Sequence, residues 1–424
     1  MAKKKMGLAS KVLIGLAIGV IVGIIVYYLP SGTLKDKILI DGIFQLVGQL
    51  FLRGIMMCVV PLVFVSLVNG AASMGDIKKL GKIGGKTIAF YLVTTAFAIM
   101  IGLLIAFIIN PGVGLDMGAI ETVEVSTRET NSLVQILYEM VPRNPIQALA
   151  EGNMLQIIIF AIFTGIGLTS IGEKGKKVLE LFEQLNELVM KLVTMIMVIA
   201  PLGVFGLVAR TFGQVGISAL VPLAKTVLGV YIALFIHGVV VYGGMLKGFT
   251  GLSPTRFYKK FYPAMAVAFS TASSSATLPV TMDIVENDIG ASKDIASFAL
   301  PLGATINMDG TAIYQGVAAV FIAQVYGIEL TVGMMATIVL SATLASIGTA
   351  GVPGAGSIML TMVLQTVGLP LEGLGLILGV DRIFDMGRTA MNITGDAVCT
   401  TIISKQEGEF DESIWNADRK KETV

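Results

Sequence analysis

The chain carries the stretch STASSSATLP at residues 270–279 and a similar stretch, ASIGTAGVPG, at residues 345–354. Each is a run of small and hydroxylated residues with a proline near its end, between apolar arms of about 10–15 residues. A helix needs about 20 residues to cross a bilayer, so such arms predict two re-entrant hairpins that enter and leave the membrane on one side. Two ordinary Ser/Gly-rich loops are the alternative, but they would leave the apolar arms without a role.

A long segment with polar residues in its middle follows each hairpin. The first contains NMDGT at residues 307–311, and the second runs from Asp381 to Asp396. Non-helical backbone at membrane depth survives only where protein or water satisfies its polar groups. Paired units of a hairpin and a broken helix therefore predict a secondary transporter with inverted repeats.

Composition agrees with a polytopic membrane protein. Of 424 residues, 54% are hydrophobic and 14% are charged, against about 45–50% and 25% in soluble domains, and the mean hydropathy is +0.83. Apolar content alone allows roughly eleven spans. A disordered chain is excluded, and a soluble enzyme is disfavoured.

Loop charges set the expected topology. Lysine and arginine gather on alternate loops, which predicts a cytoplasmic N-terminus by the positive-inside rule. No cleavable signal is evident, because the apolar run at residues 12–29 is long and lacks a small-residue exit. We expect an all-α polytopic membrane protein with eight transmembrane helices plus the two hairpins. Six crossings precede residue 250, at about residues 11–29, 38–68, 83–110, 131–171 (interrupted), 178–210 and 217–247. Residues 406–424 are expected to form a polar cytoplasmic tail with no fold of its own.

The inventory of charges, cysteines and histidine excludes several functions. A formal net charge of +1 leaves no basic surplus for nucleic acid. Cys58 and Cys399 both lie in apolar segments, so neither a disulfide framework nor a CxxC metal site is expected. The single histidine, His237, cannot form a His-rich metal centre, and we interpret it as a neutral helix residue bonded to a neighbouring helix.

Enzyme motifs are incomplete. Residues 81–87 end like a P-loop, but Leu80 stands where the motif needs its first glycine. The serine-rich stretch lacks a GxSxG elbow, and the one histidine that could act as a base is on a distant span. The chain is therefore not expected to be an ATPase or a serine hydrolase.

The last long segment carries its polar residues on one helical face. At 100° per residue, they fall within about 100° of one another. A charge facing lipid costs about 2.5–3.5 kcal/mol, so four would cost about as much as a domain's whole stability. The stripe must face a site, or alternatively form a structural salt-bridge seam. Its members are Asp381, Asp385, Arg388, Thr389, Asn392 and Asp396.

These side chains suit an acidic amino acid. Asp385 could pair with an ammonium group, and Arg388 offers a bidentate fork to a carboxylate. Backbone N–H groups at residues 273–275 could receive the α-carboxylate. Asn307, Asp309 and Asp396 are hard oxygen donors of the kind that hard cations prefer. Composition leaves Na⁺ and H⁺ open.

The stretches ASSSATLP (272–279), NMDGT (307–311), ASIGTAGVPGAG (345–356) and DMGRTAMNITGD (385–396) resemble those of the glutamate transporter family, the dicarboxylate/amino acid:cation symporters. The likeness extends over about residues 10–405 and implies a homotrimer in a lipid bilayer, working by an elevator mechanism. It divides the chain into scaffold helices 1–2 (residues 1–82), transport-domain helix 3 (83–110), scaffold helices 4–5 (111–213) and the rest of the transport domain (214–405). That last part holds helix 6, hairpin 1 at about 255–290, helix 7, hairpin 2 at about 332–367, and helix 8.

The resemblance also implies the site residues, with no cofactor and with sodium as the co-transported ion. Matching substrate positions are Ser273, Ser274, Thr311, Val352, Gly356, Asp385, Arg388, Thr389 and Asn392. The first sodium site matches Gly303, Asn307, Asn392 and Asp396. A second matches Thr305, Met308, Ser346, Ile347 and Thr349, and a third Tyr91, Thr94, Thr95, Asn307 and Asp309.

Two departures from the family pattern refine the expectation. The family's extra arginine is absent, since Ala272 and Met386 stand where different members carry it, and we hypothesise that Arg382 replaces it. Gln315 stands where animal members carry a proton-coupling glutamate, which favours sodium-only coupling. We predict a plasma-membrane, sodium-driven importer of L-aspartate or L-glutamate. A channel-like conduit is the alternative, and the preference between the two substrates and the ion stoichiometry stay open.

Overall fold

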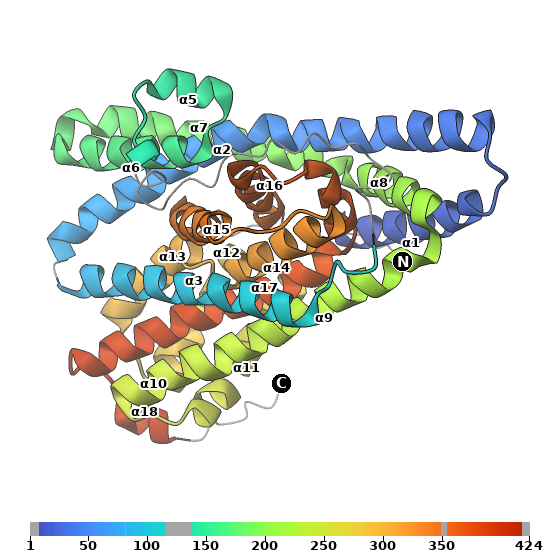
Figure 1. Cartoon of the computed structure of the whole chain (residues 1–424). Helices are drawn as coiled ribbons and strands as arrows, with labels where there is room; N and C mark the ends of the chain where they lie inside the picture. Colours follow the sequence, from blue (N-terminus) through green and yellow to red (C-terminus); the bar gives the residue numbers. More distant parts are fainter. Residues whose placement is uncertain (1–7, 81, 116–137, 349–353, 418–424) are drawn as a thin grey trace, which may run out of the picture.

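The computed structural model describes residues 8–80, 82–115, 138–348 and 354–417, and every regular element within them is helical (Figure 1). Three helical stretches in this part of the chain are long and apolar enough to cross a membrane: Thr33–Ala72, Lys82–Ile109 and Ala200–Thr250. The first extends beyond the predicted crossing 38–68 at both ends, the second nearly coincides with 83–110, and the third covers the end of 178–210 and all of 217–247. The full set of eight crossings stays a prediction.

The first half of the chain forms long helices. In chain order these are α1 (Leu8–Tyr27), η1 (Thr33–Phe44), α2 (Gln45–Leu80), α3 (Lys82–Ile109), α5 (Pro145–Glu151), α6 (Met154–Ser170), η2 (Gly172–Lys174), α7 (Lys176–Val198), α8 (Ala200–Val215), η3 (Gly216–Ala219), α9 (Leu220–Ile236), η4 (His237–Tyr242) and α10 (Gly243–Thr250). The predicted span 178–210 is divided at Ile199, and α8 then begins at Ala200 with Pro201 in its first turn, where proline is tolerated.

The second half contains shorter helices and one long one. They are α11 (Pro254–Thr271), α12 (Ser274–Ile284), η5 (Val285–Ile289), α13 (Lys293–Ile306), α14 (Asp309–Val325), α15 (Val332–Ala345), η6 (Ser346–Gly348), α16 (Ala355–Val367), η7 (Leu371–Gly373), α17 (Leu374–Gln406) and α18 (Glu412–Asn416).

Two groups of helices pack mainly among themselves. In one, α1 lies along α8, and α2 lies along α6, α7 and α8. In the other, α14 lies against α3 and α17, and α17 also contacts α9, α11 and α13. Figure 1 shows α3, α14, α17 and α9 side by side. The second group surrounds the polar stripe, whereas the division into scaffold and transport domain stays a prediction.

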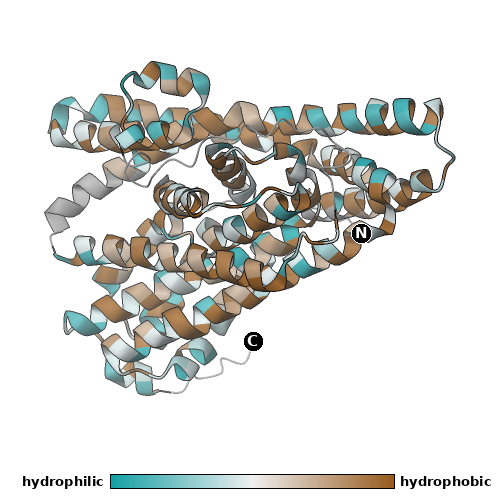
Figure 2. Cartoon of the chain, in the orientation of Figure 1, coloured by the Kyte–Doolittle hydropathy of each residue, from teal (hydrophilic) through white to brown (hydrophobic). Residues whose placement is uncertain are grey.

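Outward faces of the helices are apolar. On α1, Ile14, Ile18, Ile21 and Ile25 are exposed at helical spacing, and α3 exposes a similar stripe that includes Phe97. Figure 2 shows hydrophobic residues along most of α3 and α9. An apolar stripe of this length needs lipid or protein to cover it.

Both predicted hairpins correspond to pairs of helices, and the turn of the first pair lies within the described residues. In the first, Ala272 takes a left-handed conformation (φ 51°) and ends α11, and the Ser273 hydroxyl then caps α12 by accepting from the Ala276 N–H. The second consists of α15 and α16, which pack together. One arm is longer than expected, since α11 has 18 residues. Whether either pair is re-entrant in a membrane stays a prediction.

The prediction of two broken helices is half wrong. After the first hairpin, α13 ends at Ile306 and α14 begins at Asp309, with Asn307 extended between them (ψ 94°). After the second hairpin, α17 runs unbroken for 33 residues. Its polar side chains find partners without opening the backbone, and it contains no proline.

The prediction that residues 406–424 have no fold of their own is also wrong for the described part. Asp411 caps α18 by accepting from the Ser413 and Ile414 N–H groups. Trp415 is buried against Arg256 and Lys260 at the base of the first hairpin. The two aromatic residues of this charged segment, Phe410 and Trp415, pack against each other, and Trp415 makes the contact with the hairpin that the overall composition of the segment did not predict.

Candidate functional site

The polar stripe of the last helix is buried inside the protein. All six members lie on α17, and Arg388 is only 1% exposed although it is the largest of them. The helical spacing that predicted one face is confirmed, because Asp381, Asp385 and Arg388 meet each other on that face. Burial of three ionisable groups together requires that they satisfy one another.

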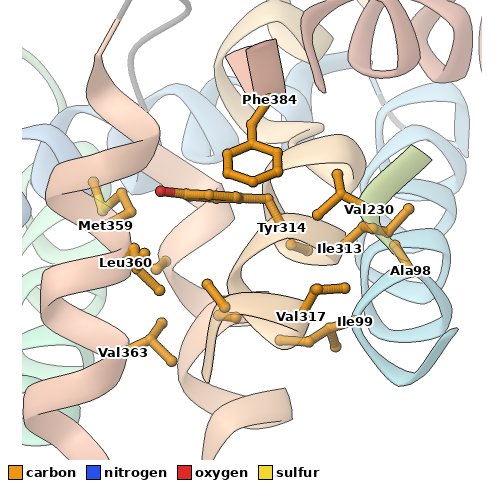
Figure 3. Close-up of a cluster of buried hydrophobic side chains, with 14 of the residues drawn as sticks. Ala98, Ile99, Val230, Ile313, Tyr314, Val317, Met359, Leu360, Val363 and Phe384 are labelled. Carbon is orange, nitrogen blue, oxygen red and sulfur yellow. The ribbon is translucent and has the colours of Figure 1, made fainter. Parts of the chain in front are cut away.

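Arg388 stands between two carboxylates and an aromatic ring. Its Nη1 lies 3.1 Å from an oxygen of Asp381, and its Nη2 lies 2.7 Å from an oxygen of Asp385. The guanidinium carbon lies 4.3 Å from the centre of the Tyr314 ring. Figure 3 shows Tyr314 between Phe384 and the apolar face of α16. The guanidinium is therefore fixed in a plane, while its Nε has no hydrogen-bond partner among the described residues.

Gly356 of the second hairpin lies against the same guanidinium. A Cβ at this position would stand 2.8 Å from Arg388 Nη1, closer than real Cβ atoms approach a nitrogen. The backbone of α16 can pass Arg388 only because this residue has no side chain. The start of α16 and the stripe thus share one small space.

The break between α13 and α14 faces the other end of the stripe. Asn307 donates from Nδ2 to Asp396 Oδ1 at 2.8 Å and to the Asn392 carbonyl oxygen at 3.0 Å. The Gly310 N–H donates to Asn392 Oδ1 at 2.8 Å. Asn307 Oδ1 is buried and has no hydrogen-bond partner among the described residues. An acceptor left free in the interior is a position at which a cation fits.

Gly303 completes this second cluster. A Cβ there would lie 2.3 Å from Asp396 Oδ1 and 2.6 Å from the Tyr91 hydroxyl oxygen. The Tyr91 hydroxyl donates to the Ala299 carbonyl oxygen at 3.0 Å. The structure therefore brings together Gly303, Asn307, Asn392 and Asp396, which the resemblance grouped as one sodium site.

Asp309, at the start of α14, has three side-chain partners. Thr95 donates to its Oδ1 at 2.5 Å. Tyr242 donates to Oδ2 at 2.7 Å, and His237 Nε2 lies 3.0 Å from the same oxygen. The bonding of His237 to a neighbouring helix is as expected. That its partner is Asp309 was missed, as was Tyr242, because no spacing in the sequence links residues 237 and 309.

The remaining predicted residues lie on nearby elements. Ser273 and Ser274 are buried at the start of α12, Thr311 is buried on α14, and Thr389 donates to the Asp385 carbonyl oxygen. Ser346 and Ile347 lie on η6, which packs against α13, the helix that carries Thr305. The others are Met308, buried at the helix break, and Thr94, buried on α3. Thr349 and Val352 lie outside the described residues.

The structure also places Arg382 and Gln315, the two residues that bear on the departures from the family pattern. Arg382 Nη2 donates to the Ser270 carbonyl oxygen near the end of α11 at 3.0 Å, and its role as a replacement for the missing arginine stays a prediction. Gln315 is buried on α14.

The comparisons identify the family. The sodium:dicarboxylate symporter family matches residues 8–406. The chain belongs to this family. It is 42% identical to the proton/sodium-glutamate symport protein of Geobacillus stearothermophilus, over 96% of each chain. It is 38% identical to the proton/glutamate-aspartate symporter of Escherichia coli (strain K12), over 96% of this chain and 94% of the relative.

A third relative widens the range of substrates within the family. The C4-dicarboxylate transport protein of Bacillus subtilis (strain 168) is 38% identical over 96% of this chain and 95% of its own length. As a member of the sodium:dicarboxylate symporter family, the chain is a multi-pass membrane protein and a transporter, not an enzyme. The sequence identity of the chain to these relatives is nearly equal, so identity alone does not distinguish among their substrates.

Proposed function

We propose that this protein is a cation-coupled symporter that imports L-aspartate or L-glutamate, driven by the sodium gradient. Its relatives are named for glutamate, aspartate or C4-dicarboxylates. The observation that carries the narrower choice is the pairing of one guanidinium with two carboxylates at the centre of α17. This cluster offers a negative charge for the ammonium group of an acidic amino acid and a positive charge for its side-chain carboxylate.

The charge at this cluster favours an amino acid over a dicarboxylate. With all three groups ionised, Asp381, Asp385 and Arg388 carry one excess negative charge. A ligand with an ammonium group would be attracted by Asp385 while its side-chain carboxylate takes a place on Arg388. A C4-dicarboxylate has no ammonium group and would meet Asp385 as an unpaired like charge, which costs several kcal/mol in a buried site.

The other substrate contacts would come from both hairpins. Ser273 and Ser274 lie at the turn of hairpin 1, where the N-terminal end of α12 carries partial positive charge. Gly356 and Val352 belong to hairpin 2, while Thr311, Thr389 and Asn392 would supply further hydrogen bonds. Because Arg388 and Asp385 are buried, substrate can reach them only when the surrounding helices move apart.

Sodium coupling is supported by the oxygen atoms around the helix break. Asn307 Oδ1 is a buried acceptor beside Asp396 that has no hydrogen-bond partner in the described part of the chain, and the backbone at Gly303 contacts the same carboxylate. Carboxylate, amide and carbonyl oxygens are the ligands that hard cations prefer.

We further propose the assembly and motion that the family resemblance implies. Three copies would associate through helices of the first group, α1, α2, α6, α7 and α8. The second group would carry the substrate across the plasma membrane as an elevator, with both termini in the cytoplasm. Native mass spectrometry of the purified protein should then show a three-chain species.

Uptake into proteoliposomes tests the function. With sodium outside only, labelled aspartate should accumulate above its external concentration, and an imposed proton gradient without sodium should not drive it. Unlabelled aspartate and glutamate should compete, whereas serine and succinate should not. Equilibration without accumulation would indicate a channel-like conduit, and proton-driven uptake would replace sodium as the coupling ion.

Arg388→Cys separates the substrate assignment from the coupling. It should abolish uptake of aspartate and glutamate, because no other described side chain of α17 offers a fork at that position, and it could admit serine or alanine. Unchanged aspartate affinity in this variant would contradict the assignment.

A further inference from the structure

The helix that carries His237 changes its winding at this residue. Regular α9 ends at Ile236, and residues His237–Tyr242 form the π-helical turn η4 before α10 resumes. The Gly243 N–H donates to the Gly238 carbonyl oxygen, five residues earlier. Single π-helical turns within α-helices occur frequently at functional sites.

This turn brings two side chains to one face. In a regular α-helix, residues five apart lie about 140° apart around the axis. The i→i+5 hydrogen bonding of η4 places His237 and Tyr242 one above the other instead. Their ring centres lie 4.6 Å apart, edge to face. Both then reach the same atom, Asp309 Oδ2.

The neighbouring helices α17 and α11 are shaped to fit against the π-helical turn. A Cβ on Gly395 of α17 would lie 2.2 Å from the Tyr242 hydroxyl oxygen and 2.4 Å from Asn307 Nδ2. On the far side, the Tyr258 hydroxyl of α11 donates to the Gly238 carbonyl oxygen at 2.6 Å. Elements from four parts of the chain thus converge on the π-helical turn and on Asp309.

The hydrogen bonds divide the two oxygens of Asp309. Oδ2 accepts from Tyr242 and faces His237, while Oδ1 accepts from Thr95. Because a carboxylate only accepts, His237 bonds through an Nε2–H, and its Nδ1 has no partner among the described residues. His237 and Tyr242 therefore both bond to Asp309 Oδ2, while Asp309 Oδ1 faces Thr95 on α3.

We propose that His237 and Tyr242 are positioning residues for a cation at Asp309. By holding Oδ2, they fix the carboxylate so that Oδ1 faces Thr95 and the ion, in the way that outer partners orient metal-binding carboxylates. The inference rests on the proposed sodium coupling and adds two residues that the family resemblance did not supply. Neither residue touches the ion or the substrate.

The test uses four variants of the full chain in proteoliposomes. Tyr242→Phe removes one donor, His237→Leu removes the other, and His237→Gln keeps an N–H near the position of Nε2. Thr226→Val is the matched control, since it removes a buried hydroxyl from α9 that bonds only within its own helix. Initial aspartate uptake is measured against external sodium at fixed pH and membrane potential.

Loss of either donor should raise the sodium concentration for half-maximal uptake by about tenfold or more, because hydrogen bonds to charged groups are strong. The aspartate KM at saturating sodium should stay within about twofold, a split that a general packing defect would not give. His237→Gln should recover most of the loss, and Thr226→Val should behave as wild type.

Three outcomes would overturn the proposal. One is an unchanged sodium dependence in both Tyr242→Phe and His237→Leu. Another is tighter sodium binding in His237→Leu, which would mean that the imidazole opposes the ion. The third is equal loss in His237→Gln and His237→Leu. If His237→Leu does not fold, Tyr242→Phe and His237→Gln decide alone. Wild-type uptake that ignores sodium would instead refute the proposed coupling itself.

Discussion

At the scale of single residues, glycines decide which charged groups can meet. Gly356, Gly303 and Gly395 each lie where a Cβ would collide with a polar atom of the site. Glycine at such positions is usually explained by backbone freedom, yet none of these three has a positive φ. Their role is close approach of backbone to a buried side chain.

Gly356→Ala tests this reasoning at the substrate cluster. The new methyl group would displace the Arg388 guanidinium, which is held by two carboxylates, and we expect aspartate affinity to fall about tenfold or more. Isothermal titration or the uptake KM measures it. Gly244→Ala is the control, because a Cβ there meets nothing within 4 Å. Equal affinity in both variants would show that the guanidinium moves freely.

At the scale of elements, the end of the chain supports the first hairpin. Trp415 packs against Arg256 and Lys260. The centre of its ring lies 5.8 Å from the guanidinium carbon of Arg256 and 5.5 Å from Lys260 Nζ. The Lys260 amine also donates to the carbonyl oxygens of Asp288 and Ile414, at 2.7 and 2.9 Å. α18 therefore closes the base of the α11–α12 pair.

Trp415→Ala should destabilise the protein, because removal of a buried tryptophan costs about 3–5 kcal/mol. We expect a clear drop in the thermal unfolding midpoint in detergent. Tyr262→Ala is the matched control, since this aromatic side chain of α11 is 67% exposed. A midpoint unchanged by loss of Trp415 would mean that the tail adds nothing to the hairpin.

At the scale of the whole molecule, the proposed elevator requires the two helix groups to slide past one another. They meet where α8 packs against α17. A Cβ on Gly375 would lie 2.9 Å from the Cβ of Leu207, which is about 1 Å shorter than the mean Cβ–Cβ separation of about 3.8 Å in disulfides. Cysteines at these two positions should cross-link once α8 and α17 have moved apart by about 1 Å.

The cross-link Leu207→Cys/Gly375→Cys, in a chain with Cys58 and Cys399 replaced by alanine, should stop uptake while leaving aspartate binding intact. Reduction with dithiothreitol should restore transport, and each single-cysteine chain should be insensitive to oxidant. Full uptake by the cross-linked protein would exclude sliding at this contact and favour local gating by the hairpins alone.

Sequence by itself determined the membrane character, the two helix pairs that we predict to be hairpins, and the polar stripe of α17. These features depend on local pattern, since apolar length, helical period and capping are properties of neighbouring residues. Tertiary structure alone decided which partners the buried groups take. The pairing of His237 and Tyr242 with Asp309, the packing of Trp415 and the unbroken course of α17 depend on contacts between distant segments. Such contacts leave no periodic pattern in the sequence from which they could be predicted.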